Sequence, residues 1–325
     1  MHCYSARRGA GGCSAVNAGS RLRTGGLRDR RRRTCCRRGL VPMSARKCSR
    51  IALVVPTYLE AENIESFLRA ARATLPTADV IVCDDNSPDG TGQIADRVGV
   101  EIGNTYVLHR PSKQGLGAAY RQGFRVALDQ GADTVVQMDV DFSHPHAMLP
   151  EMIGRVDAGA DVVIGSRYVA GGGTPDWPPH RRLLSKYGNL YARRLLRLPV
   201  RDATSGMRAY WGPALEKIKF DATRANGYGF MLETIRAMAV TGLRIEEVPL
   251  VFRDRVAGTS KMSIKIMFEN LVLVTWWGMS IRFPRLTRPF RASPAGRYLS
   301  GLVSHAAGTG NACPMVHRTG GPETE

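Results

Sequence analysis

The chain has 325 residues, an apolar share of 43% and a formal net charge of +18. That length suits one large α/β domain or two small ones, and the apolar share is typical of a globular protein. The charge would suggest a nucleic-acid partner, but residues 1–50 hold fourteen Lys or Arg and one acidic residue, a charge of +13, so the other 275 residues carry only +5. Five of the seven cysteines also lie in residues 1–50, so the cysteine-poor body argues against a disulfide framework and favours a reducing cytoplasmic compartment.

Residues 1–50 are predicted to be a disordered Arg/Cys-rich extension. The stretch RLRTGGLRDRRRRTCCRRGL has no apolar period and lacks the apolar core of a secretory signal. An RNA-binding arm and a polybasic membrane arm are alternative interpretations. Because Met43 lies just before the first predicted strand, residues 1–42 are also interpreted as translated from a start codon upstream of the true one.

Strands and helices are predicted to alternate in the body of the chain, starting at Ile51. The apolar, strand-like runs are 51–55, 79–85, 105–109, 134–138 and 161–165. The helical segments are 61–74, 90–98, 114–130 and 145–157. Continuous Val/Ile runs separated by helices predict an α/β fold with a mostly parallel central sheet that is covered on both faces. In such folds, ligands bind at the carboxyl ends of the strands.

Two carboxylates, Asp139 and Asp141, end the fourth predicted strand in VVQMDVDFSHP. In an extended segment, side chains at positions i and i+2 point the same way, so both carboxylates are expected on one side. Mg²⁺ or Mn²⁺ would supply the missing positive charge, and such ions bind through one or two carboxylates plus substrate phosphates. The alternative is a turn in which aspartate caps the helix that begins near Pro145.

A second polar segment, DDNSPDGT, follows the second strand. Asp84 is placed to accept hydrogen bonds from a nucleobase or ribose, although the composition also fits an ordinary turn. Glu60, just past the first strand, is either a ligand contact or a residue of a first helical turn. The chain has no GxxxxGK[ST] phosphate loop and no GxGxxG after a strand. The glycines of residues 113–123 are expected to permit close helix packing.

The longest apolar stretch, 262–283, is not predicted to cross a membrane. Its uncharged run, 270–281, has twelve residues, whereas a bilayer span needs about twenty. The pair Trp276–Trp277 followed by Arg282 suits an amphipathic helix at a membrane surface, and a core helix with inward tryptophans is the alternative. Residues 261–286 are therefore assigned as a membrane-interface segment, and the Gly/Pro/Arg-rich residues 287–325 as a disordered tail.

Eight blocks of the sequence together resemble the family 2 inverting glycosyltransferases, and more narrowly the polyprenol- or dolichol-phosphate mannosyltransferases. The blocks are PTYLEAENI, DDNSPDGTG, KQGLGAAYRQGF, MDVDFSHP, GSRY, TSGMRAY, GYGFMLE and EVPLVFRDRVAGTSK. The resemblance covers residues 51–283. It implies a GT-A nucleotide-sugar-binding domain over residues 51–260, with GDP-mannose as the donor and a polyprenyl monophosphate as the acceptor.

The resemblance also implies roles for individual residues. The donor site would consist of Pro56, Tyr58, Glu60, Val82, Asp84, Asp139, Val140, Asp141, Arg255 and Lys261. The metal, Mg²⁺ or Mn²⁺, would be held by Asp139, Asp141 and Ser143. The acceptor phosphate would be bound by Arg167, Arg181 and Ser185, and the catalytic residues would be Asp141, Arg167 and Arg181.

Some positions depart from the family pattern. Leu59 stands where the family commonly has Asn, and Met231 where it usually has Gln, so both are expected to remove polar contacts. Ser143 replaces a frequent Gln, and Met207 replaces an aromatic residue. Leu59 and Met231 are not expected to touch the two carboxylates.

An ionised acceptor phosphate needs no strong general base, and His109, His144, His146 and His180 show no paired carboxylate motif. The expected product is a β-linked mannosyl phosphoryl polyprenol, formed by single displacement. A hydrocarbon-tailed acceptor implies a peripheral enzyme on the cytoplasmic face of the membrane, with a separate membrane-anchoring protein as a further partner and no nucleic acid. The alternatives are a transferase of another nucleotide sugar, such as UDP-glucose, and a basic nucleic-acid-binding protein.

Overall fold

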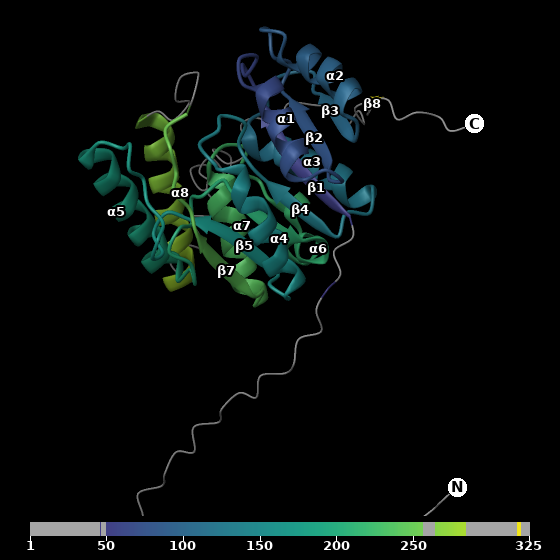
Figure 1. Cartoon of the computed structure of the whole chain (residues 1–325). Coiled ribbons are helices and arrows are strands. Elements are labelled where there is room, and N and C mark those ends of the chain that lie inside the picture. Colours follow the sequence, from purple (N-terminus) through teal and green to yellow (C-terminus); the bar gives the residue numbers. More distant parts are fainter. Residues whose placement is uncertain (1–45, 47–49, 256–263, 284–316, 320–325) are drawn as a thin grey trace, which may run out of the picture. The chain divides into compact units, whose positions relative to one another are not determined.

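The computed structural model describes residue 46 and residues 50–255, 264–283 and 317–319. The described strands form one eight-stranded sheet in the order β7-β5-β6-β4-β1-β2-β3-β8 (Figure 1). They are β1 (Ile51–Thr57), β2 (Asp79–Asp84), β3 (Thr105–His109), β4 (Thr134–Gln137), β5 (Val162–Ser166), β6 (Arg208–Trp211), β7 (Ile245–Pro249) and β8 (His317–Thr319). The sheet is mostly parallel, but β6 runs antiparallel to β4 and β5, and β8 runs antiparallel to β3.

Helices cover both faces of this sheet. They are α1 (Ile64–Thr74), α2 (Thr91–Ile102), α3 (Leu116–Asp129), α4 (Leu149–Asp157), α5 (Pro179–Leu196), α6 (Gly212–Ile218), α7 (Gly229–Thr241) and α8 (Ile264–Arg282). Alternate strand residues point to opposite faces. Leu53 and Val55 therefore pack under α1, α2 and α4, whereas Val54 packs under α3, α6 and α7.

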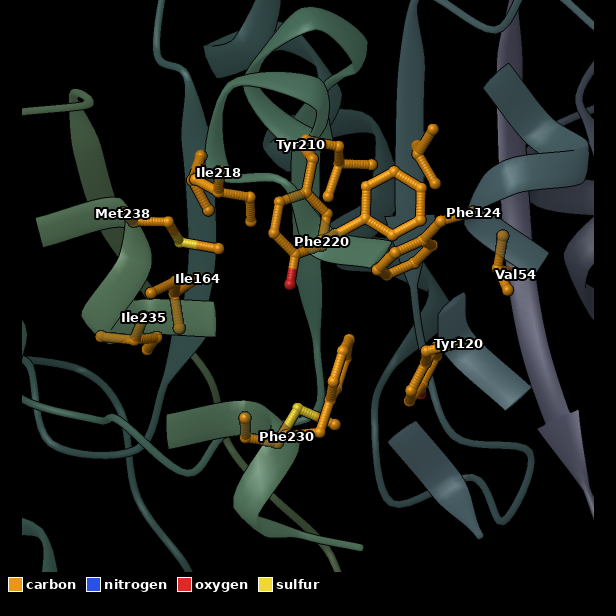
Figure 2. Close-up of a cluster of buried hydrophobic side chains, with 14 of the residues drawn as sticks. Val54, Tyr120, Phe124, Ile164, Tyr210, Ile218, Phe220, Phe230, Ile235 and Met238 are labelled. Carbon is orange, nitrogen blue, oxygen red and sulfur yellow. The ribbon is translucent and has the colours of Figure 1, made fainter. Parts of the chain in front are cut away.

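Aromatic side chains fill the layer between the sheet and α3, α6 and α7 (Figure 2). Phe124 lies at its centre, with its ring centroid 5.5 Å from that of Tyr210 and 5.8 Å from that of Phe220. A Cβ added at Gly123 would lie 2.3 Å from Cγ1 of Val54, so only glycine lets α3 come this close to β1. This contact confirms the prediction that the glycines of residues 113–123 serve close packing.

The structure contains all five predicted strands, but strands β6, β7 and β8 of the sheet were not predicted. Residues 60–63 form a turn closed by the N–H groups of Asn63 and Ile64 on the carbonyl of Glu60, so α1 begins at Ile64 and not at Ala61. No elements were predicted between residues 166 and 260, where α5, α6, α7, β6 and β7 lie. Within residues 287–325, expected to be disordered, residues 317–319 form β8.

The α8 helix packs along α5. A Cβ at Gly278 would lie 2.2 Å from Cγ of Leu195, and the hydroxyl oxygens of Tyr191 and Thr275 are 2.8 Å apart. Trp277 packs inward against the core, as in the alternative interpretation of this segment, whereas Phe268 is 64% exposed. Among the helices that the structure describes, none combines the length and the apolar character needed to span a bilayer.

Candidate active site

The turns after β1 and β2 are joined by a buried carboxylate, Asp84. Its Oδ1 accepts hydrogen bonds from the hydroxyls of Thr57, at 2.9 Å, and Ser87, and its Oδ2 accepts one from the N–H of Ser87 at 3.0 Å. The Ser87 hydroxyl in turn accepts from the N–H of Leu59. These bonds show Asp84 as the brace of a turn, which was the alternative interpretation, and its contact with a nucleotide stays a prediction.

Other predicted donor-site residues lie on these two strands and on the turn after β1. The ring of Tyr58 carries the Lys113 ammonium 3.8 Å above its centre. The Oε2 of Glu60 accepts a hydrogen bond from the Asn63 amide at 2.9 Å. Pro56 pairs with Cys83 in the sheet. The side chain of Val82 is fully buried in the core under α1 and α2.

The next carboxylate, Asp85, forms a buried ion pair with Arg110 that the sequence analysis missed. Asp85 Oδ2 also faces the N–H groups of Gln114 and Gly115, at 3.3 and 3.4 Å. Arg110 extends the network to the side chain of Gln122 at 2.8 Å. The network ties the ends of β2 and β3 to the start of α3.

The two carboxylates after β4 lie in a bend. The strand ends at Gln137, and Phe142 adopts a left-handed backbone conformation, with φ of +59°. The expectation of an extended backbone is therefore wrong here, whereas the expectation that both carboxylates lie on one side stays a prediction. At this bend the Phe142 ring lies beside the rings of Phe67, at 6.0 Å, and His146, at 5.5 Å, between centroids.

Asp139 is surrounded by residues from distant parts of the chain. The Tyr120 hydroxyl donates to its Oδ1 at 3.2 Å, and His144 Nδ1 lies 4.0 Å from its Oδ2. A Cβ at Gly206 would lie 2.9 Å from the same Oδ2. His144 was predicted to have no paired carboxylate, and this is wrong, because the bend brings the histidine back to Asp139.

Asp141 is more buried, with a side chain 9% exposed against 36% for Asp139. Its Oδ1 accepts a hydrogen bond from the N–H of Ser143 at 3.1 Å, and its Oδ2 lies 3.2 Å from Nη2 of Arg255. The bond from Ser143 makes a turn at Asp141, but no side chain of the described residues caps the helices that begin at His146 and Leu149, so the alternative of an aspartate helix cap is wrong. Burial, with the charges of Asp139 and Asp141, raises the pKa of Tyr228 to about 12, which marks this tyrosine as a further neighbour of the pair.

The donor atoms at the bend fit a divalent cation that brings ligands of its own. Within the described residues, no group of three or more His, Cys, Asp or Glu side chains is arranged to hold a metal ion. The buried Oγ of Ser143 has no hydrogen-bond partner there, and it lies next to Asp141. Two carboxylates and one free hydroxyl suit an ion whose coordination is completed by substrate phosphates.

Two of the predicted acceptor-phosphate residues, Arg167 and Arg181, lie beside Trp177, and the third, Ser185, contacts Tyr168. The guanidinium carbons of Arg181 and Arg167 lie 4.1 and 5.5 Å from the centre of the Trp177 ring. The hydroxyl of Tyr168, next to Arg167 in the chain, donates to Ser185 at 2.7 Å. The sequence analysis missed Trp177, although it lies only four residues before Arg181.

The charge of Arg167 is largely neutralised by a partner that the sequence analysis missed. Its Nε and Nη2 donate to the two oxygens of Asp202 at 2.7 and 2.8 Å, and Nη2 also donates to Thr204. Burial alone would raise the pKa of Asp202, but the charge and hydrogen bonds of Arg167 hold it below its ordinary value. Arg181 is more exposed and pairs with Asp254 at 3.1 Å. Lys261 lies outside the described residues.

Two of the four departures from the family pattern, Met231 and Leu59, have different surroundings. Met231 is 2% exposed, and its sulfur accepts a hydrogen bond from the Gln137 amide at 3.0 Å, so it belongs to the core. Leu59 is 46% exposed and adopts a left-handed backbone, with φ of +55°. Of the two, Leu59 is therefore the residue available to a ligand.

Comparison with known proteins relates the chain to one family of enzymes. A family model described as glycosyl transferase family 2 matches residues 52–219. The undecaprenyl-phosphate mannosyltransferase of Micrococcus luteus is 44% identical over 237 residues, which are 73% of this chain and 97% of that protein. The polyprenol monophosphomannose synthase of Mycolicibacterium smegmatis is 40% identical over 245 residues, 75% of this chain and 92% of that protein.

Solved structures with a similar fold have more distant sequences. Mannosyl-3-phosphoglycerate synthase from Rubrobacter xylanophilus has a TM-score of 0.53 and 17% identity, over 75% of each chain. Glucosyl-3-phosphoglycerate synthase from Mycobacterium tuberculosis has a TM-score of 0.52 and 20% identity, over 71% of this chain and 78% of that chain. These similarities confirm the predicted GT-A fold.

Proposed function

Because the chain belongs to glycosyl transferase family 2, we propose that it transfers mannose from GDP-mannose to a polyprenyl monophosphate. The observation that carries the proposal is the juxtaposition of Asp139, Asp141 and the unpaired hydroxyl of Ser143 at the carboxyl end of β4. The names of two relatives, at 44% and 40% identity, support mannose as the sugar and a polyprenyl phosphate as the acceptor.

Asp139, Asp141 and Ser143 would hold the metal, Mg²⁺ or Mn²⁺. When bound, this cation would neutralise the negative charge that develops on the leaving diphosphate. The residues of the donor site would bind the guanosine at the turn after β1, and the backbone of Val140, with Arg255 and Lys261, would contact the diphosphate. The position of Asp139 supports this arrangement, because Tyr120 and Gly206 restrain its carboxylate from two sides.

The acceptor needs positioning and charge neutralisation more than proton removal. A phosphate monoester is already largely ionised at pH 7, so its oxygen can attack without a strong general base. Arg181 and Ser185 would bind this phosphate, with Arg167 beside them. Since Arg167 is buried and bound to both oxygens of Asp202, whereas Arg181 makes a single exposed ion pair with Asp254, we assign the larger electrostatic part to Arg181. In-line attack at the anomeric carbon would invert the α-linked donor to a β-linked product.

Because the acceptor has a hydrocarbon tail, the enzyme would act at a bilayer surface. Exposed apolar side chains on α5 and α8 supply a surface for it: Leu183, Leu184, Tyr187, Phe268, Leu271, Met279 and Ile281. Apolar residues flanked by Lys and Arg are typical of helices that lie in the interface. We place the enzyme at the cytoplasmic face of the membrane, where a separate membrane-anchoring protein would assist it.

A donor screen tests the assignment. The full chain is incubated with a short polyprenyl phosphate, Mn²⁺ and one donor at a time, GDP-mannose or UDP-glucose, and the lipid product is analysed by mass and by NMR of the anomeric centre. We expect a β-mannosyl lipid from GDP-mannose. A glucosyl lipid from UDP-glucose alone would overturn the mannose assignment, and an α-linked product would overturn single displacement.

A further inference from the structure

The ion pair between Arg255 and Asp141 occupies one of the two carboxylates that would hold the metal. Asp141 Oδ2 lies 3.2 Å from the Arg255 guanidinium, and Oδ1 accepts the Ser143 N–H. Both oxygens of this nearly buried side chain are therefore engaged within the protein. A divalent cation that approached the bend would meet a carboxylate whose charge is already balanced.

Arg255 is brought to Asp141 by a segment that several contacts fix in place. The N–H of Leu250 donates to the carbonyl of Ser166, that of Phe252 to Gly173, and that of Arg253 to Ser143. The last bond joins the segment directly to the carboxylate bend. The Phe252 ring also lies 5.5 Å from the His144 ring, centre to centre. These contacts fix the backbone that leads to Arg255, so the arginine lies beside Asp141 in the folded site.

We infer that Arg255 occupies the Asp141 carboxylate in place of the metal until the nucleotide binds, and that it thereby couples metal binding to nucleotide binding. This inference rests on the proposed function. A diphosphate offers the guanidinium a bidentate partner of higher charge than one carboxylate. When Arg255 turns to the diphosphate, Asp141 is released to the cation, which the phosphates also bind. Binding of the nucleotide and binding of the metal are then cooperative.

The test measures binding of Mn²⁺ itself, not activity. Free Mn²⁺ is quantified by electron paramagnetic resonance during titration of the full chain, with and without GDP, for wild type, Arg255→Gln and Arg255→Lys. Without GDP, we expect Arg255→Gln to bind Mn²⁺ about tenfold more tightly than wild type, because the competing cation is gone. The factor by which GDP tightens Mn²⁺ binding should fall by a similar amount. Arg255→Lys, which keeps the charge, should stay near wild type.

Arg253→Gln is the matched control, because it removes an exposed positive charge two residues away in the same segment. It should change Mn²⁺ affinity little. Equal or weaker Mn²⁺ binding by Arg255→Gln without GDP would overturn the inference. Asp141→Asn distinguishes this result from a failure of the proposed function. If Asp141→Asn too leaves Mn²⁺ binding unchanged, the carboxylates do not hold the metal, and both proposals fail.

Discussion

Gly206 determines how closely the chain can pack against the first carboxylate of the site. In Gly206→Ala, the new Cβ would lie 2.9 Å from Oδ2 of Asp139, so the carboxylate must shift. Because a displacement of about 1 Å in a positioning group can cost roughly a hundredfold in rate, we expect kcat to fall by at least tenfold. Steady-state kinetics would measure the fall, alongside thermal unfolding to check that the fold is kept.

Gly173→Ala is the matched control, because no atom of the described residues lies within 4 Å of a Cβ at that position. It should retain most of the activity. If Gly206→Ala were as active as this control, the close packing around Asp139 would have no catalytic importance.

Leu59 is held in a backbone conformation that disfavours leucine. Its φ is +55°, and its N–H is fixed by the Ser87 hydroxyl. Asparagine tolerates the left-handed region better, so Leu59→Asn should raise the free energy of unfolding by about 1 kcal/mol. Urea denaturation would measure the gain. Leu59→Ala keeps the strain and loses little packing, so an equal gain in that variant would show that strain at Leu59 is not the cause.

His146 makes the stability of the fold depend on pH. Burial lowers its pKa from the ordinary 6.5 to about 4. Between these two values the unfolded chain binds a proton that the folded chain excludes, so this residue's contribution to stability is complete above pH 6.5 and declines as the pH falls toward 4. The free energy of unfolding of His146→Gln should therefore decrease less between pH 6.5 and pH 4 than that of wild type. His180→Gln, at an exposed position, controls for loss of a histidine, and identical pH slopes in all three proteins would contradict the prediction.

At the scale of elements, Arg208 joins β6 to the loop before it and to α7. Its guanidinium is fully buried and donates to the carbonyls of Ala203, Ser205 and Met231 and to the Thr234 hydroxyl, at 2.9 to 3.2 Å. Arg208→Met would leave these buried acceptors without their donor, and we expect a loss of roughly 3 kcal/mol in stability. Chemical denaturation would measure it, and a loss below about 1 kcal/mol would show that β6 does not need this brace.

The exposed apolar side chains of α5 and α8 are proposed to contact the membrane. The double variant Leu184→Glu, Phe268→Glu places two charges on exposed positions of these helices. We expect at least tenfold weaker binding to vesicles with anionic lipid in a flotation assay, because charged side chains partition poorly into the interface. Val240→Glu alters an exposed valine on α7 and should bind as wild type does. Equal binding by all three proteins would remove these helices from the membrane contact.

At the scale of the molecule, the basic N-terminal residues are separable from the proposed reaction. Residues 1–42 contain eleven arginines and one aspartate, so their deletion reduces the net charge from +18 to +8. We expect the shortened chain to keep its transferase activity. It should bind heparin only at salt concentrations lower than those at which the full chain binds, since the affinity for heparin follows the net positive charge. Loss of activity on deletion, in a protein that still unfolds cooperatively, would give these residues a part in the reaction.

The sequence predicted the parts of the fold that follow from local patterns. The apolar runs of β1 to β5 and the carboxylates after β4 are visible as short stretches. The four-residue strand β6 has no such run, and it lies between β4 and β5 through pairings that only the folded chain reveals. The contacts of Asp139 with Tyr120 and Gly206 join residues far apart in sequence, so spacing could not indicate them.

The measurement that tests the central claim most directly is transfer of labelled mannose from GDP-mannose to a short polyprenyl phosphate, with and without Mn²⁺. Wild type is compared with Asp141→Asn and with Asp129→Asn, a control at an exposed carboxylate. The account predicts a metal-dependent mannosyl lipid for wild type and the control, and a rate lower by at least about a hundredfold for Asp141→Asn. Formation of the lipid at equal rates by all three proteins, or its absence with wild type, would contradict the account.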